Sequence, residues 1–194
     1  MKHLLTLLIS CLSLLYASAQ GFTISSFHAD IQLSREGKIE VTENIDVFFT
    51  EQKRGIYRDI PYKFKNAGKK YTTDISDITV VGHPFKVSKK NGMKSIRIGD
   101  PDIYLTGNQK YTIRYTVEGP FLSSPEFCEF YWNVTGNDWQ ATIDKASFAV
   151  TLPDSLVIRY NNLRVFTGAS GENGKDATIR QEGRTIKGET TAPI

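Results

Sequence analysis

Hydrophobic and polar residues alternate along most of the chain with a period of two, the pattern of half-buried β-strands. In residues 27–33 the apolar side chains occupy every second position, and His28, Asp30 and Gln32 lie between them. Residues 38–50 repeat the pattern after a turn that contains Gly37, so the two segments predict a β-hairpin. Further strands are expected over residues 73–81, 85–88, 110–118, 127–134, 146–152 and 156–167, and near Ile179 and Ile186.

Turn sequences rich in Gly, Pro, Asn and Asp separate these segments. The clearest is Lys89-Lys90-Asn91-Gly92, which predicts a tight hairpin. Residues 53–70 have no clean period, and their Lys, Arg, Gly and Pro content predicts a long loop. No long amphipathic helix is recognisable. We therefore predict an all-β fold with little helix, an antiparallel β-sandwich of the immunoglobulin-like or a related type. One or two β subdomains both remain possible.

The N-terminus has the features of a secretory signal peptide. Lys2 and His3 precede an apolar run, and Ala17-Ser18-Ala19 forms a small-x-small cleavage site. We expect residues 1–19 to be removed and residues 20–194 to form the exported β-sandwich domain. The alternatives are an N-terminal membrane anchor, for which the run is shorter than the roughly 20 residues of a span, and lipoprotein processing at Cys11.

Composition narrows the class of protein. The 194 residues are 40% hydrophobic and 23% charged, enough for a sizeable core and unlike a disordered chain. The 24 basic and 21 acidic residues give a net charge of +3, with the signs interspersed, so no nucleic-acid partner is expected. Two Cys and three His leave little for a metal site. Cys128, the cysteine that remains after cleavage, has inward parity and is expected to be a packed, unreactive thiol.

The most distinctive stretch is Arg54-Gly55-Ile56-Tyr57-Arg58-Asp59-Ile60-Pro61. Glu43 has the parity of the apolar face of its strand, where a carboxylate must be paired or neutral. We predict that Arg58, or else Arg54, reaches Glu43 as a bidentate partner. The predicted structural clasp between loop and sheet comprises Glu43, Arg54, Arg58 and Asp59. A ligand-binding or catalytic Arg/Asp pair and simple solvated charges are the alternatives.

A second stretch, residues 132–139, contains both tryptophans of the chain. Trp132 shares the parity of apolar neighbours and is expected in the core, with a turn after it. The alternative is ligand binding, in which Asn137, Asp138 and Trp139 contact a sugar ring and its hydroxyl groups.

No catalytic constellation is recognisable. His28 lies on a polar strand face and His83 precedes a proline, and neither fits a triad or metal pattern. Glu126 and Glu129 are candidate glycosidase carboxylates, but their spacing on a strand would put them on opposite faces. We expect no catalytic residues, no cofactor and no metal.

Four segments in order, 24–31, 37–43, 55–61 and 131–136, resemble the N-terminal region of the YciQ-like predicted bacterial membrane proteins, domain of unknown function 2207. The resemblance implies an exported N-terminal domain followed by transmembrane helices. The chain would then be the front part of a longer envelope protein, tethered to the membrane by a downstream transmembrane segment not present in this chain. The family has no established activity, so no catalytic residue is carried over.

These observations favour a non-enzymatic, extracytoplasmic β-sandwich at the periplasmic or extracellular face of the bacterial envelope. It would act as an interaction or sensing module, and its expected partner is an unidentified protein or glycan of the envelope. A glycan-binding module is the first alternative, and an envelope-polymer hydrolase is the second.

Overall fold

The computed structural model describes residues 21–66, 68–123, 128–156, 158, 162–168 and 172–194, so the predicted signal peptide lies outside the described residues. The described residues form strands and turns and contain no helix. Accordingly, that part of the chain offers no helix capable of spanning a membrane. The predicted all-β class and its sandwich-like arrangement of mainly antiparallel sheets are confirmed.

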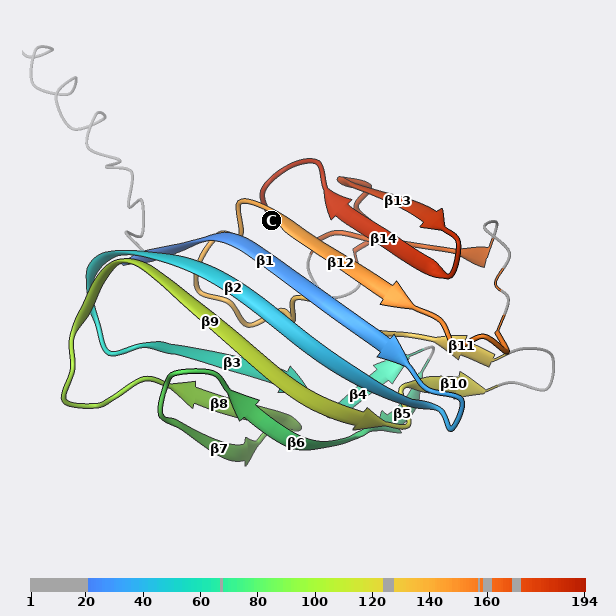
Figure 1. Cartoon of the computed structure of the whole chain (residues 1–194), viewed down its shortest axis with the longest axis horizontal. Helices are drawn as coiled ribbons and strands as arrows, with labels where there is room; N and C mark the ends of the chain where they lie inside the picture. The colour runs from blue at the N-terminus through green and yellow to red at the C-terminus, as the bar shows by residue number, and fades with distance from the viewer. Residues whose placement is uncertain (1–20, 67, 124–127, 157, 159–161, 169–171) are drawn as a thin grey trace, which may run out of the picture.

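The larger layer is a seven-stranded sheet with the order β13-β14-β12-β1-β2-β9-β6 (Figure 1). Its strands are β1 (Phe22–Leu33), β2 (Lys38–Lys53), β6 (Asp74–Val80), β9 (Leu105–Glu118), β12 (Ala146–Thr151), β13 (Ala177–Glu182) and β14 (Thr185–Thr190). All neighbours are antiparallel except β1 and β12. The predicted first hairpin is confirmed, with Phe27 opposite Ile45 and Leu33 opposite Ile39.

Three small sheets complete the fold. A three-stranded sheet has the order β3-β8-β7, and two hairpins consist of β4 with β5 and of β10 with β11. The strands are β3 (Ile56–Pro61), β4 (Lys63–Asn66), β5 (Lys69–Thr72), β7 (Phe85–Lys90), β8 (Met93–Ile98), β10 (Phe121–Ser123) and β11 (Cys128–Phe130). The β3-β8-β7 sheet runs alongside β9 in Figure 1, and its inward side chains join the core of the large sheet.

The core forms where alternating side chains of the two layers meet. Strand β9 buries Tyr111, Ile113, Tyr115 and Val117, and the same pattern along β2 buries Glu43 among aliphatic residues. The small layer contributes Ile56, Ile60, Ile96 and Ile98. Burying each aliphatic side chain stabilises the fold by about 1.5–3 kcal/mol relative to leaving it in water.

The predicted long loop over residues 53–70 is wrong, because these residues contain β3, β4 and the start of β5. Ile56, Arg58 and Ile60 point inward on β3. Because the middle inward residue, Arg58, is charged, the hydrophobic residues of this segment do not show a period of two. By contrast, the predicted turn at Asn91-Gly92 is confirmed, with positive φ angles of 52° and 80° that suit a type I′ hairpin.

Two other strand predictions differ from the structure, one in length and one in its described residues. Of the described residues within 127–134, only those of β11 form a strand; in the segment 156–167, residues 157 and 159–161 lie outside the described residues and the others form no strand. Cys128 is exposed instead of packed. Cys128 lies at the end of the β10–β11 ribbon, opposite Ser123, whereas Phe130, which has the same parity, packs against the core.

Gly55, just before β3, and Gly99, just after β8, allow the backbone to come close where β3 begins and β8 ends. Both glycines have φ angles of 129°, which side chains disfavour. An added Cβ on Gly55 would overlap the Ile98 carbonyl, and one on Gly99 would overlap the Arg54 carbonyl. This close approach sets where β3 starts, and therefore which of its residues faces β2.

Candidate functional site

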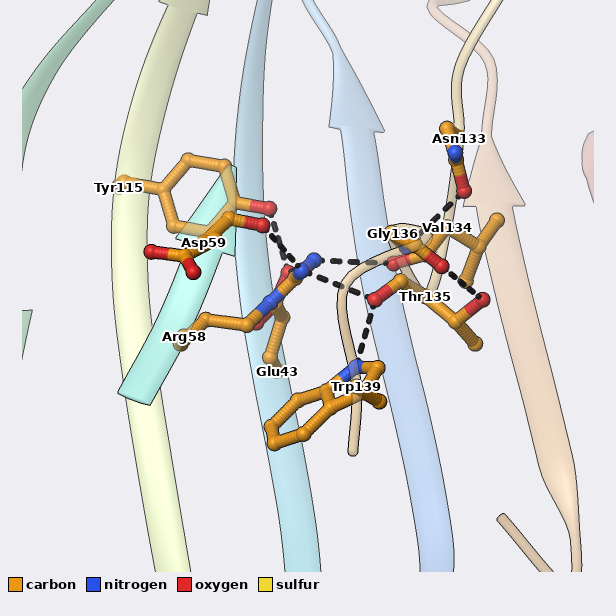
Figure 2. A network of polar contacts seen from close by, with 9 residues as sticks. All are labelled: Glu43, Arg58, Asp59, Tyr115, Asn133, Val134, Thr135, Gly136 and Trp139. Atoms are coloured by element: carbon orange, nitrogen blue, oxygen red, sulfur yellow. Dashed lines mark hydrogen bonds and ion pairs between the residues drawn. The ribbon is translucent and has the colours of Figure 1, made fainter. Parts of the chain in front are cut away.

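The side chain of Arg58 runs from β3 into the core and meets Glu43 of β2 (Figure 2). Arg58 is 1% exposed and Glu43 is 0% exposed. The Arg58 Nε atom donates to Glu43 Oε2 at 2.8 Å, and Nη2 donates to Oε1 at 2.7 Å. The pair is therefore bidentate and shielded from water, the strong form of an arginine–carboxylate contact.

The remaining donors of the guanidinium bind backbone carbonyls. Nη1 donates to Thr135 and to Asp59, each at 2.9 Å, and Nη2 donates to Val134 at 3.2 Å. An arginine side chain has five N–H groups, and here each has an acceptor. Arg58 thus links three parts of the chain: β3, β2 and the loop after β11.

Tyr115 of β9 completes the network, with its hydroxyl group donating to Glu43 Oε1 at 2.6 Å. Burial, together with the negative charge of Glu43, raises the pKa of Tyr115 well above its ordinary value. Burial alone would lower the pKa of Arg58, but the charge and hydrogen bonds of Glu43 outweigh it and raise this pKa. We call Glu43, Arg58, Tyr115 and the three backbone carbonyls the arginine clasp.

Aromatic rings and a tight loop close over the clasp. The guanidinium carbon of Arg58 lies 5.4 Å from the ring centre of Phe27 and 6.0 Å from that of Trp139. The indole nitrogen of Trp139 donates to the Thr135 carbonyl at 2.8 Å. Gly136 has a φ of 79°, and an added Cβ would lie 2.6 Å from Arg58 Nη1. Glycine is needed here because the loop passes directly over the guanidinium.

The structure brings together only some of the residues predicted for the clasp. Arg58 pairs with Glu43 as expected, whereas the alternative partner, Arg54, is exposed and hydrogen-bonds to the Tyr104 hydroxyl. Asp59 contributes its backbone carbonyl and not its side chain. The period of two along β3 explains this division, since Arg58 points into the core and its neighbours on the strand point away.

A groove of about 250 Å³ lies beside the clasp. Its lining consists of Phe22, Gly55, Ile56, Tyr57, Arg58, Asp59, Asp138, Trp139 and Gln140. Asp59 Oδ1 is buried and has no hydrogen-bond partner among the described residues, while the Tyr57 side chain is 61% exposed. The groove therefore combines an exposed aromatic ring with a carboxylate, one oxygen of which is buried and unsatisfied among the described residues.

The three candidate glycan-binding residues are not equivalent. Asp138 and Trp139 line the groove, but Asn137 does not, and its Oδ1 accepts a hydrogen bond from Asn133 Nδ2 at 2.9 Å. Trp139 packs edge-on against Phe27, with the ring centres 6.4 Å apart, and its N–H is already used within the loop. Trp139 is thus part of the wall that covers the clasp.

Sequence reasoning missed two residues, Tyr57 and Tyr115. Residues 55–61 were expected to form a loop, so nothing put Tyr57 and Asp59 on one side of a strand. Tyr115 sits opposite Val41 in the β2–β9 pairing, diagonal to Glu43. The alternation in residues 110–118 indicates that the Tyr115 side chain points inward. The strand register that brings Tyr115 close to Glu43 is set by the tertiary structure and cannot be read from the local sequence.

A polar cluster lies on the outer face of the large sheet, in a shallow groove of about 270 Å³. The Nδ1 atom of His28 lies 2.7 Å from Ser147 Oγ, and its Nε2 atom lies 3.3 Å from Asp30 Oδ1. The order hydroxyl, imidazole, carboxylate matches a catalytic triad. Sheet geometry also produces it directly, because His28 pairs across with Ser147, and Asp30 follows two residues later on the same face.

The other candidates for chemistry are dispersed. Glu126 lies outside the described residues, and Glu129 is exposed on β11. His83 is in ring contact with Tyr111, 4.8 Å between centres. Among residues 21–66, 68–123, 128–156, 158, 162–168 and 172–194, no three His, Cys, Asp or Glu side chains gather as a metal site would require.

Residues 23–192 match the family model described as predicted membrane protein (DUF2207) N-terminal domain. The uncharacterized protein YciQ of Escherichia coli (strain K12) is 29% identical over 169 residues. The match covers 83% of this chain and 27% of YciQ, so the chain spans about a quarter of that relative's length.

Solved structures with a similar fold include native leukotriene A4 hydrolase from Saccharomyces cerevisiae, with a TM-score of 0.53 and 10% sequence identity. The match covers 90% of this chain and 28% of the hydrolase. A second structure of the native yeast enzyme has a TM-score of 0.51 and 9% identity, with 90% and 27% of the two chains covered. At these identities the likeness shows the fold alone.

Replacing Arg58 tests the clasp. Arg58→Ala should lower the free energy of unfolding by about 3–5 kcal/mol, because it leaves Glu43 buried without a partner. Chemical denaturation measures the loss. The control Arg54→Ala removes an exposed arginine from the same stretch and should cost less than about 0.5 kcal/mol.

If Arg58→Ala is too unstable to purify, the double variant Glu43→Leu with Arg58→Met provides the measurement. It buries no charge and should be clearly more stable than Arg58→Ala. Equal denaturation midpoints for the unaltered chain and Arg58→Ala would contradict the clasp.

Two buried tyrosines differ in their partners, and this difference is testable at neutral pH. The Tyr111 hydroxyl is buried without a hydrogen-bond partner among the described residues, so Tyr111→Phe should be neutral or stabilising. Tyr115→Phe removes a hydrogen bond to a charged group and should cost about 1.5–3 kcal/mol. Equal effects of the two substitutions would contradict the assigned hydrogen bond.

The two buried tyrosines, Tyr111 and Tyr115, also predict how the stability of the fold changes at alkaline pH. Burial raises the pKa of Tyr111 to about 12, and that of Tyr115 also lies above its ordinary value. Above a pH of about 10 the unfolded chain releases these protons first, so stability should fall as pH rises, by up to about 1.4 kcal/mol per pH unit for each group. Each Phe variant should show a shallower decline in denaturation experiments over this range.

Proposed function

The chain belongs to the DUF2207 family of predicted membrane proteins, as its N-terminal domain, and from this premise we propose that it is a non-enzymatic, extracytoplasmic interaction module of a membrane-anchored envelope protein. The signal-peptide pattern of residues 1–19 supports export. The domain would bind a protein or glycan of the envelope through the groove beside the arginine clasp.

One observation carries the proposal: Asp59 Oδ1 is buried in the lining of a preformed groove and has no partner among the described residues. A buried polar atom without a partner costs about 1–3 kcal/mol, which a ligand that donates a hydrogen bond would recover. Tyr57 stands at the same groove with 61% of its side chain exposed, and exposed tyrosines are frequent anchors of binding sites.

The saturation of the arginine clasp supports a structural role for Arg58. Its five N–H groups bind Glu43 and three backbone carbonyls, so no donor is left for a substrate. This counts against a catalytic or ligand-binding Arg58/Asp59 pair. The groove would therefore be a recognition surface held in shape by the clasp beneath it.

Glycan binding is the second candidate. Tyr57 supplies a flat apolar ring, and the carboxylates of Asp59 and Asp138 supply acceptors for sugar hydroxyl groups. Tyr57 is a better stacking platform than Trp139, since the indole ring packs on Phe27.

Capture from envelope extract tests the proposal, with the purified chain as bait. A protein or glycan should be retained by the unaltered chain and lost with Tyr57→Ala. The matched control is Tyr104→Ala, which removes a tyrosine that is 55% exposed elsewhere and should retain the same partner. Retained oligosaccharide that also disappears with Asp138→Asn would establish the glycan candidate. Equal capture by all variants would refute the groove as the binding site.

The non-enzymatic proposal can be tested at the cluster of His28, Asp30 and Ser147. Strands β1 and β12 are interior strands, so their backbone N–H groups serve the sheet and are not available as an oxyanion hole. A fluorophosphonate reagent should therefore leave Ser147 unlabelled, as read by mass spectrometry. Labelling of the unaltered chain that is lost in both Ser147→Ala and His28→Ala would show an activated serine and overturn the non-enzymatic proposal.

A further inference from the structure

The even charge balance of the whole chain conceals a strongly basic segment. Residues 63–97 contain nine of the 24 basic residues and two of the 21 acidic ones. The rest of the chain has 15 basic and 19 acidic residues. The prediction that the two signs are interspersed is therefore wrong for this segment, which supplies both strands of two hairpins, β4–β5 and β7–β8.

Seven exposed lysines lie on these hairpins, on both sides of their strands, and we call them together the lysine face. They are Lys63, Lys65, Lys69, Lys70, Lys86, Lys89 and Lys90. The hairpins adjoin at Tyr62, since the backbone N–H groups of Tyr62 and Lys63 both bind the Gly92 carbonyl at the tip of β7–β8. The ammonium groups of Lys63 and Lys89, one from each hairpin, both lie 5.6 Å from the centre of the Tyr62 ring.

Like charges face one another across these strands. The directly opposed pairs are Lys65 with Lys70, Lys86 with Arg97, and Lys89 with Lys94. Opposed like charges destabilise a sheet. None of these six residues forms an ion pair with a carboxylate in the described part of the chain.

In the large sheet, by contrast, lysines lie opposite carboxylates. Lys38 is opposite Glu118 and Lys110 is opposite Asp46, and both pairs form salt bridges. Where two cations do oppose each other, Arg180 and Lys187, the carboxylate of Glu182 binds both. Among the described residues, no carboxylate binds the opposed cations of the small hairpins, so an anion from another molecule would relieve their repulsion.

Aromatic rings accompany the lysines. The ring of Phe64 on β4 stacks with Tyr71 at 5.6 Å and with Tyr131 at 5.7 Å, and Tyr131 is 43% exposed. Lysines with long apolar stems beside tyrosine rings are the side chains favoured at the boundary between lipid and water. The cations spread along two hairpins, an arrangement that suits an extended layer of anions.

We propose that the lysine face docks on the anionic phospholipid headgroups of the membrane. The inference deepens the proposed function and rests on it, because an exported domain of a membrane-anchored protein is held next to such a surface. Contact with the bilayer would fix the orientation of the domain and so determine in which direction the groove near Tyr57 faces.

Vesicle co-sedimentation of the purified chain tests the docking. Vesicles of phosphatidylcholine mixed with phosphatidylglycerol should bind the chain, and vesicles of phosphatidylcholine alone should not. Binding should be lost at about 1 M salt, where the screening length falls to about 3 Å. The triple variant Lys65→Gln, Lys69→Gln, Lys70→Gln should reduce partitioning about a hundredfold, from roughly fivefold per lysine.

The matched control is Lys38→Gln, Lys110→Gln, Lys145→Gln, which removes the same charge from lysines that are ion-paired on or beside the large sheet. It should bind vesicles within about twofold of the unaltered chain, because it leaves the lysine face intact. Circular dichroism of both variants confirms that they fold.

Three results would overturn the proposal: equal binding to neutral and anionic vesicles, equal losses in the two triple variants, or preferential binding to single-stranded DNA or polyphosphate that the vesicles fail to displace. Vesicle binding needs no partner molecule and is measured on a different surface from the groove. Its failure is therefore distinguishable from a failure to capture an envelope ligand through Tyr57.

Discussion

The buried contact between Glu43 and Arg58 is the constraint on which the remaining structure depends. Removing a carboxylate and a guanidinium from water costs several kcal/mol for each ion, and only close pairing with full hydrogen bonding offsets this cost. Glu43 lies on the inner face of β2 because of its parity, so the fold must bring it a cation. Arg58 reaches it only when β3 lies under the large sheet in one register.

The same contact organises a distant part of the chain. After pairing with Glu43, the guanidinium still has N–H groups that need acceptors, and the loop after β11 supplies two of them through Val134 and Thr135. This arrangement explains two residues of the loop. Position 136 must be glycine because a side chain there would collide with Arg58, and the ring of Trp139 covers the guanidinium. The two distinctive stretches of the sequence, residues 54–61 and 132–139, thus meet at the guanidinium of Arg58.

The charged side chains inside the molecule are paired, whereas some charged groups near its surface have no oppositely charged partner in the part of the chain that the structure describes. The interior ion pair is complete, and lysines of the large sheet form salt bridges with the carboxylates opposite them. Among the described residues, Asp59 Oδ1 in the groove has no hydrogen-bond partner, and the lysine face on the small hairpins has no carboxylate partner. Both features lie in the segment between β2 and β9, which therefore holds the parts of the domain best suited to contact other molecules.

The sequence by itself determined the β class, the first hairpin, the Asn91-Gly92 turn and the need of Glu43 for a cation. These follow from local alternation, turn chemistry and the cost of burying a charge, each of which acts within a few residues. Tertiary structure decided that residues 56–61 form a strand, since the inward Arg58 breaks the apolar pattern. It also decided that Tyr115 joins the clasp, that Cys128 is exposed and that lysines from two hairpins gather, because strand register and layer packing join residues that local patterns treat separately.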